Sequence, residues 1–122
     1  MWSNRLVRAC LLAVFCLGAE CEAGPAVTCP GTTSEAGHVA ALVDARLYFG
    51  PPANLLEQIG DADKGQWQLS LLQTQAKEER THLYLVCRYA HTKSTVTLEL
   101  PAGARKCVVS LTRAGKTSAS CV

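Results

Sequence analysis

Alternating apolar and polar positions run through most of the chain and predict β-strands. The clearest run is residues 83–90, where Leu83, Leu85, Cys87 and Tyr89 share one phase and mostly polar residues take the other. A strand of this kind buries one face and exposes the other. The same period, or a short piece of it, recurs at residues 27–29, 38–49, 66–71, 95–100, 105–111 and 118–122.

Residues 38–49 fit two periods. The apolar residues at odd positions from Val39 to Phe49 predict a strand, whereas Val39, Leu42, Val43 and Leu47 also share one face of a helix. We expect a strand at residues 45–49 and leave the type of residues 38–44 open.

The segments between these runs carry turn residues. Gly50-Pro51-Pro52 ends one strand, because proline cannot donate to a sheet ladder. Residues 53–59 fit one or two helical turns, residues 32–37 a loop, and residues 73–80 an exposed hairpin loop. We therefore predict a mainly β domain, a small antiparallel sheet or sandwich of roughly five or six strands, with at most one short helix.

The first 23 residues have the layout of a secretory signal peptide. Arg5 and Arg8 precede an apolar run at residues 9–19, which is too short for a membrane-spanning helix of ~20 residues. Small residues then favour cleavage near Ala23, with Gly24-Pro25-Ala26 as the alternative site. A buried N-terminal helix or a membrane anchor is the other interpretation of this segment. We expect an exported chain, periplasmic or secreted, with one domain at residues 24–122.

Cysteine counting supports this cleavage site. Of the seven cysteines, three would leave with the signal and an even number would remain: Cys29, Cys87, Cys107 and Cys121. Glu20 directly before Cys21 does not fit a lipidation signal. Four cysteines in an exported domain predict two disulfides, with three possible connectivities.

The four cysteines share the buried phase of their strands, which is typical of structural disulfides. We favour Cys29–Cys121, which would tie the two ends of the domain, together with Cys87–Cys107. If residues 83–90, 95–100 and 105–111 were strict neighbours, Cys87 and Cys107 would lie about 9–10 Å apart. A disulfide needs Cα atoms within roughly 7 Å, so this pairing requires the strands to part or bulge.

Composition and motifs narrow the chemistry. The 12 basic and 10 acidic residues are dispersed, which argues against a nucleic-acid binder, and no second segment is apolar enough for a membrane span. Gly115-Lys116-Thr117 resembles the end of a phosphate-binding loop, but Ser110 stands where that loop needs its first glycine. Residues 61–65 resemble the start of a calcium loop, but Leu72 stands where a bidentate glutamate is needed.

The histidines give no better site. His38, His82 and His91 have no metal-ligand spacing, and a set of Ser70, His82 and Asp44 lacks any supporting motif. We therefore expect no catalytic residue, no cofactor and no metal, and a protein that is not an enzyme.

Two tyrosines and two arginines form the candidate interaction surface. Tyr48, Tyr84, Arg46 and Arg88 fall on the outward phase of their strands, and exposed tyrosine and arginine suit a protein interface. Amphipathic side chains that simply lie on a sheet surface are the alternative. The loops at Gly50–Asn54, Gln73–Arg80 and His91–Ser94 are candidate contacts as well.

The order of these motifs resembles one family, short exported proteobacterial proteins without an assigned activity, named after a typhoid-bacillus locus tag of the STY series. The matching residues cover nearly the whole mature chain: Cys29-Pro30, Gly50-Pro51-Pro52, Trp67, Leu85-Val86-Cys87-Arg88-Tyr89, Leu100-Pro101-Ala102-Gly103, Cys107 and Cys121. The family form has an aspartate before G-P-P, where this chain has Phe49. The resemblance implies a periplasmic or secreted β domain and no particular activity.

These observations favour a protein-binding module, an inhibitor of an envelope hydrolase or an immunity protein against a delivered toxin. Its partner would be an envelope protein or that toxin, and the sequence does not predict an oligomeric state. A passive envelope or stress protein without a specific ligand is one alternative. A small hydrolase of envelope polymers is the other, and it needs convergent polar groups in a concave site.

Overall fold

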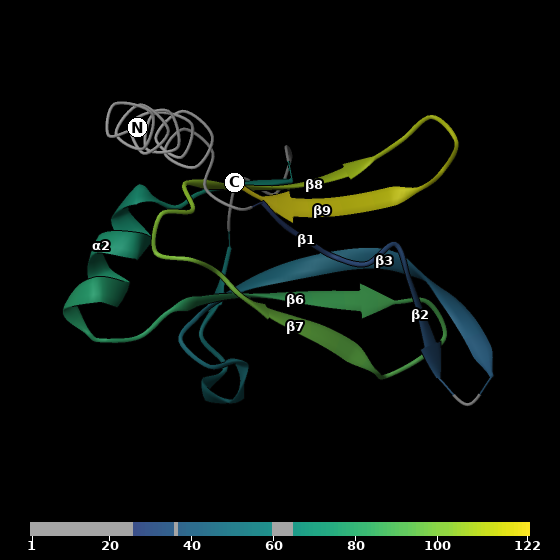
Figure 1. Cartoon of the computed structure of the whole chain (residues 1–122), viewed down its shortest axis with the longest axis horizontal. Coiled ribbons are helices and arrows are strands. Elements are labelled where there is room, and N and C mark those ends of the chain that lie inside the picture. Colours follow the sequence, from purple (N-terminus) through teal and green to yellow (C-terminus); the bar gives the residue numbers. More distant parts are fainter. Residues whose placement is uncertain (1–25, 36, 60–64) are drawn as a thin grey trace, which may run out of the picture.

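Strands dominate residues 26–35, 37–59 and 65–122, which the computed structural model describes (Figure 1). The predicted signal peptide and residues 61–64 of the calcium-like turn lie outside these residues. The elements are β1 (Val27–Thr28), β2 (Thr32–Glu35), β3 (His38–Phe49), the 3-10 turn η1 (Pro52–Asn54), β4 (Glu57–Gln58), β5 (Gln66–Gln68), α2 (Ser70–Glu78), β6 (Leu83–Tyr89), β7 (Thr95–Glu99), β8 (Lys106–Leu111) and β9 (Thr117–Cys121). The predicted mainly β, antiparallel class is confirmed.

The strands form two antiparallel sheets. The first has the order β1-β9-β8-β5, and the second has the order β2-β3-β6-β7, with β4 also paired to β3. The chain leaves the second sheet after β7 and enters the first with β8. The simple meander of neighbouring strands that we expected over residues 83–111 is therefore wrong, since β8 pairs with β5 and β9 instead of β7.

A bulge in β3 explains its mixed periodicity. Leu42 is buried in one phase, and Ala45 and Leu47 are buried in the other, because the pairing with β6 shifts register between Leu42 and Asp44. Residues 38–44 are thus strand, but the odd-phase prediction fails before the bulge. Val39, before the bulge, and Val43, within it, are exposed instead of buried.

Two segments differ from the sequence prediction in type. Residues 70–78 form helix α2, where we expected the end of a strand and a hairpin loop, and residues 32–35 form strand β2 where we expected a loop. Leu69 and Ala76 are buried on one side of the helix, while Leu71 points to solvent. Of the helical turns expected at residues 53–59, only the 3-10 turn η1 is present, and strand β4 follows it.

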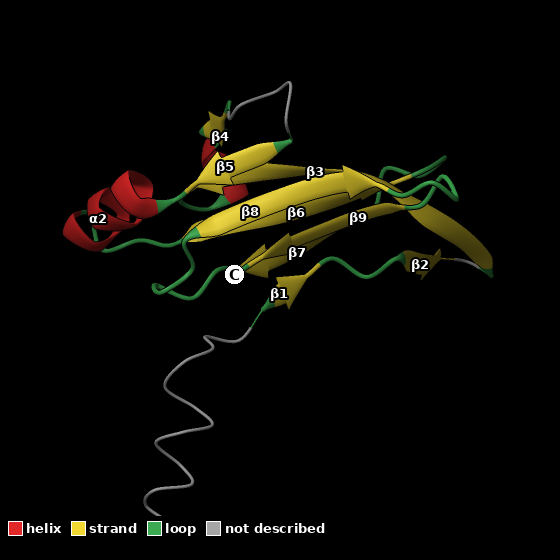
Figure 2. Cartoon of the chain, turned by 90° about the horizontal axis from the view of Figure 1, so that it is seen from above, coloured by secondary structure: helices red, strands yellow, loops and turns green. Residues whose placement is uncertain are grey.

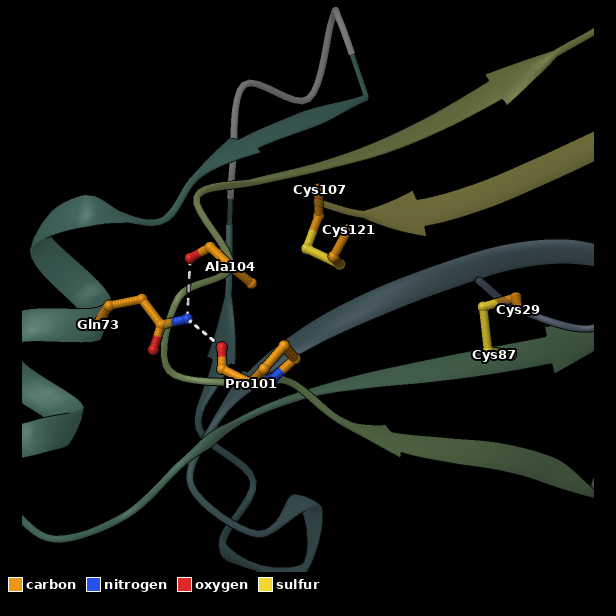
Figure 3. The surroundings of a disulfide bond; sticks show 7 residues. All are labelled: Cys29, Gln73, Cys87, Pro101, Ala104, Cys107 and Cys121. Atoms are coloured by element: carbon orange, nitrogen blue, oxygen red, sulfur yellow. Dashed lines mark hydrogen bonds between the residues drawn. A yellow bond between two sulfur atoms is a disulfide. The ribbon is translucent and has the colours of Figure 1, made fainter. Parts of the chain in front are cut away.

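Helix α2 holds the crossover between the two sheets. The Gln73 side-chain amide donates hydrogen bonds to the carbonyl oxygens of Pro101 (3.0 Å) and Ala104 (2.9 Å) (Figure 3). These carbonyls belong to the turn that leads from β7 to β8. One side chain therefore bonds two backbone acceptors in the segment where the chain changes sheets, although the Pro101 oxygen also accepts from the Ala104 N–H (3.0 Å).

The core lies between the sheets. Leu47, Leu69, Leu83 and Leu85 have no exposed surface, and Leu100 is 1% exposed. Each fully buried leucine contributes roughly 1.5–3 kcal/mol relative to an exposed one. No helix among the described residues is long and apolar enough to cross a membrane.

Both disulfides lie in this core, but their pairing corrects our preference. Cys29 bonds to Cys87, and Cys107 bonds to Cys121 (Figure 3). Cys107 and Cys121 are directly opposite each other on neighbouring strands of the first sheet. The preferred Cys87–Cys107 link fails because it assumed that β8 continues the sheet of β6. The inward orientation of all four cysteines is confirmed, since none is more than 4% exposed.

Candidate interaction surface

The face of the second sheet that points away from the core carries a continuous set of polar and aromatic side chains, which we call the outer face. Strand pairing arranges them in rows across β4, β3, β6 and β7, because paired residues in an antiparallel sheet point to the same side. The rows are Glu57–Tyr48–Tyr84–Glu99, then Arg46–Val86–Thr97, then Asp44–Arg88–Thr95.

All four residues predicted for the interaction surface lie on the outer face. Tyr48 and Tyr84 are direct cross-strand partners, and Arg46 and Arg88 follow in the next two rows. The prediction of their common orientation came from strand phase alone.

Two glutamates flank the tyrosine pair. The Tyr48 hydroxyl donates to Glu57 Oε1 (3.4 Å), and the Tyr84 hydroxyl donates to Glu99 Oε1 (3.3 Å). Partial burial, followed by the charge and hydrogen bond of Glu99, raises the pKa of Tyr84. The Nε2 atom of His82 lies 3.7 Å from the same Glu99 oxygen. Each tyrosine hydroxyl of the pair therefore donates a hydrogen bond to a glutamate on the neighbouring strand.

Arg46 is fixed by two carboxylates. Its Nε donates to Asp44 Oδ2 at 2.7 Å, and its NH1 donates to Glu57 Oε2 at 3.2 Å. The hydrogen bond and charge of Asp44, with a smaller effect of Glu57, raise the pKa of Arg46. Arg88 makes no ion pair with the described residues. Its exposed charge is thus available to a partner, whereas that of Arg46 is largely balanced.

Val86 sits at the centre of the outer face and is only 8% exposed. The longer side chains around it cover it, although it points away from the core. The outer face thus presents aromatic and charged side chains around a buried valine, and aromatic residues and arginine are enriched at protein interfaces.

Two open depressions lie near the second sheet. The smaller, of about 300 Å³, lies beside the outer face and is lined by Asp44, Arg46 and Glu57, together with Trp67 and Val109 of the first sheet. The Trp67 indole N–H donates to the Gln58 carbonyl oxygen (2.9 Å), which ties β5 to β4 where the two strands lie close in Figure 2. The larger, of about 820 Å³, is lined by β2, by the start of β3 and by the residues after β6.

The three histidines do not come together in one catalytic or metal-binding site within the described residues. His38 and His91 line the larger depression, while His82 lies at the opposite end of β6. Asp44 pairs with Arg88, six residues along the strand from His82, which places Asp44 and His82 about 20 Å apart. Within the described residues, no three His, Cys, Asp or Glu side chains are grouped to hold a metal ion.

The three candidate loops do not form one surface. Gly50–Asn54 lies at the start of β6, where the Gly50 N–H donates to the His82 carbonyl oxygen (2.9 Å), and His91–Ser94 lies at the other end of that strand. Gln73–Arg80 is mostly helix α2.

Sequence reasoning also missed Glu57 as part of the site. The residue lies on a two-residue strand that has no alternation of its own, and only its pairing with Tyr48 reveals its position.

One comparison with known proteins is positive. The model of the type VI secretion system Tli immunity protein family matches residues 36–122, which include β3 to β9 and the whole outer face. No curated protein and no solved structure matches the chain significantly. Cys29 precedes the matched residues, whereas its partner Cys87 lies within them. The resemblance to the STY-series family is not tested by these findings and stays a prediction.

Proposed function

The chain belongs to the type VI secretion system Tli immunity protein family, and we propose that it neutralises a toxin by binding it with the outer face. Family membership confirms the predicted class of inhibitor- or immunity-like protein-binding module. An immunity protein acts on a partner protein through its surface, so the role is inhibitory and needs no catalytic group of its own.

We choose the outer face as the toxin-binding surface because of the Tyr48–Tyr84 pair. The two rings are adjacent, their hydroxyls are held by Glu57 and Glu99, and Val86 beside them is already dry. These exposed hydrogen bonds of 3.3–3.4 Å favour one orientation of each ring, which reduces the conformational entropy lost when a partner covers the rings. Tyrosine and arginine are also the residue types that most often dominate binding energy at interfaces.

We propose the periplasm as the compartment where this binding occurs. Two buried disulfides support an oxidising environment, and the signal-like sequence of residues 1–23 agrees with export. A toxin delivered into the periplasm would meet the protein there.

The test is the affinity of the purified protein for candidate type VI toxins, beginning with the products of genes that neighbour its own, measured by isothermal titration calorimetry. We expect Tyr48→Ala and Tyr84→Ala each to weaken binding about thirtyfold or more, as for central interface residues. Arg88→Glu should also weaken it. The matched control is Arg113→Glu, an exposed arginine on the β8–β9 turn, which should bind as the wild type does.

Two results would count against the proposal in different ways. No measurable binding by the wild type would reject this toxin as the partner. Wild-type affinity in all three outer-face variants would keep the immunity role and move the contact to another surface. Unfolding temperatures of the variants would show that they are folded.

A further inference from the structure

Strand β7 is an unpaired edge of the second sheet. It pairs with β6 on one side only, and it borders the sheet in Figure 1. At five residues it is the longest edge strand among the described elements, the others being β1, β2, β4 and β5.

Strand β7 has only one of the usual protections of a sheet edge, the charge of Glu99 at its end. Proteins block open edges with proline, lysine or a bulge, because unpaired backbone groups recruit other strands. Residues 95–99 read Thr-Val-Thr-Leu-Glu, which are mostly good strand formers with one charge at the end. The side chains of Val96 and Leu98 pack against the core but are only partly buried, so a further strand would cover them.

The direction of the free backbone groups follows from the pairing with β6. The Leu100 N–H donates to the Leu83 carbonyl oxygen (2.8 Å), and in an antiparallel pair such bonded positions alternate. The backbone N–H and C=O groups of Val96 and Leu98 are therefore hydrogen-bonded to β6. The N–H and C=O groups of Thr95, Thr97 and Glu99 point to the open edge.

We propose that this edge binds a second copy of the chain, with the two β7 strands antiparallel about a two-fold axis at Thr97. This register pairs Thr97 with Thr97 of the second copy and Thr95 with Glu99 of the second copy. All the outward-pointing groups then meet one another, which allows about six backbone hydrogen bonds. Val96 of one copy then lies opposite Leu98 of the other on the inner side of the sheet. Both side chains are partly buried in the single chain, so the dimer adds apolar contacts there.

Charge favours the same arrangement. In each copy Thr95 lies beside Arg88, and Glu99 lies beside Tyr84. The two-fold axis brings Glu99 of one copy into the row of Arg88 of the other, with only Thr95 between them. A register that set Glu99 against Glu99 would oppose like charges and shorten the paired segment. The two outer faces join into one continuous surface across the dimer.

The primary test is sedimentation equilibrium of the protein purified from cells that express the full chain. Because the contact involves one short strand, we expect a weak dimer whose fraction rises with concentration up to about 1 mM. Thr97→Pro should be a monomer at every concentration, because it removes an N–H that bonds the second copy. The pairing with β6 should survive, because β6 does not use this N–H. Thr32→Pro is the matched control, the same change on the opposite edge of the sheet, and should dimerise like the wild type.

Charge variants at position 95 test the register. Thr95→Lys places a lysine opposite Glu99 of the second copy at two symmetric points, and should tighten the dimer about two- to thirtyfold. Thr95→Glu should weaken it by a similar factor. If both substitutions change the affinity in the same direction, the register is wrong.

Amide signals in nuclear magnetic resonance spectra supply a residue-level readout. On dilution, the N–H groups of Thr95, Thr97 and Glu99 should lose protection from exchange, while those of Val96 and Leu98 stay unchanged. A single-copy mass for the wild type at all concentrations overturns the proposal. Loss of toxin affinity in Thr97→Pro together with that single-copy mass would assign the edge to the toxin instead of a second copy.

Discussion

Cys29 and Cys87 join the two sheets through a disulfide between residues 58 positions apart, with their Cα atoms 5.8 Å from each other. Cys29 follows β1 and its N–H donates to the Ala119 carbonyl oxygen (2.9 Å), so it extends the edge of the first sheet. The next residues are held by the second sheet, since the Tyr89 hydroxyl donates to the Pro30 carbonyl oxygen (2.8 Å). The N-terminal segment is thereby fixed across both layers.

The two disulfides should differ in their effect on stability. In the chain-entropy model the Cys29–Cys87 bond, which closes the longer loop, contributes about 4 kcal/mol and the Cys107–Cys121 bond about 3 kcal/mol. We expect the double variant Cys29→Ala/Cys87→Ala to lose more unfolding free energy in urea than Cys107→Ala/Cys121→Ala. The pairs are matched, since all four residues are buried and each variant removes two sulfur atoms. An equal or reversed order would contradict the loop-length argument.

Gly65 should be the least replaceable glycine of the described residues. Its φ is +59°, and a Cβ there would lie 2.6 Å from the Val109 carbonyl oxygen, a backbone atom inside the first sheet. We expect Gly65→Ala to cost about 3 kcal/mol or more. Gly115→Ala is the control, because Gly115 also has a positive φ (+77°) but open space around it, and should cost only about 1–2 kcal/mol. Urea unfolding measures both, and equal losses would show that the contact with Val109 relaxes.

Replacing Gln73 should loosen the crossover between the sheets. Gln73→Ala removes the donor to the Pro101 and Ala104 carbonyl oxygens, and we expect a loss of about 1–3 kcal/mol of unfolding free energy. Gln75→Ala, an exposed change on the same helix, should stay within about 0.5 kcal/mol of the wild type. If the two variants are equally stable, the carbonyls find other donors.

Alternation along the chain was enough to predict the shared orientation of four side chains of the outer face. In residues 83–89 every odd position is buried, and Val86 is the buried exception on the outer phase. The odd phase of residues 45–49 holds because it lies beyond the bulge in β3. The phase of two strands then places Arg46, Tyr48, Tyr84 and Arg88 on one side. Local pattern sufficed here because a strand's period is set by its own backbone.

Alternation does not show which strands pair with each other. The same alternation fits β8 beside β7 or in the other sheet, so the sequence could not show that Cys107 lies opposite Cys121. Helix α2 was missed because Trp67, Leu69 and Leu71 mimic a strand. The buried positions Leu69 and Ala76 are helically spaced, but they are too few to outweigh that pattern.

Alkaline pH should destabilise the protein through Tyr89. Burial raises the pKa of Tyr89, and burial followed by Glu99 raises that of Tyr84. The folded state thus holds each phenolic proton more tightly than the unfolded state does. The stability from this difference is fully present below the unfolded pKa of about 10, and is lost as the pH rises through the folded-state pKa.

Phenylalanine variants separate the two tyrosines. Tyr89→Phe should cost about 1 kcal/mol at neutral pH, because the hydrogen bond to the Pro30 carbonyl oxygen is lost. Its unfolding free energy should then fall less steeply above pH ~10 than that of the wild type. Tyr84→Phe is the control on the same strand, and should change the neutral-pH stability less because its hydroxyl bonds an exposed glutamate. The measurement is urea unfolding at a series of pH values, and an alkaline limb as steep in Tyr89→Phe as in the wild type would assign the effect to other groups.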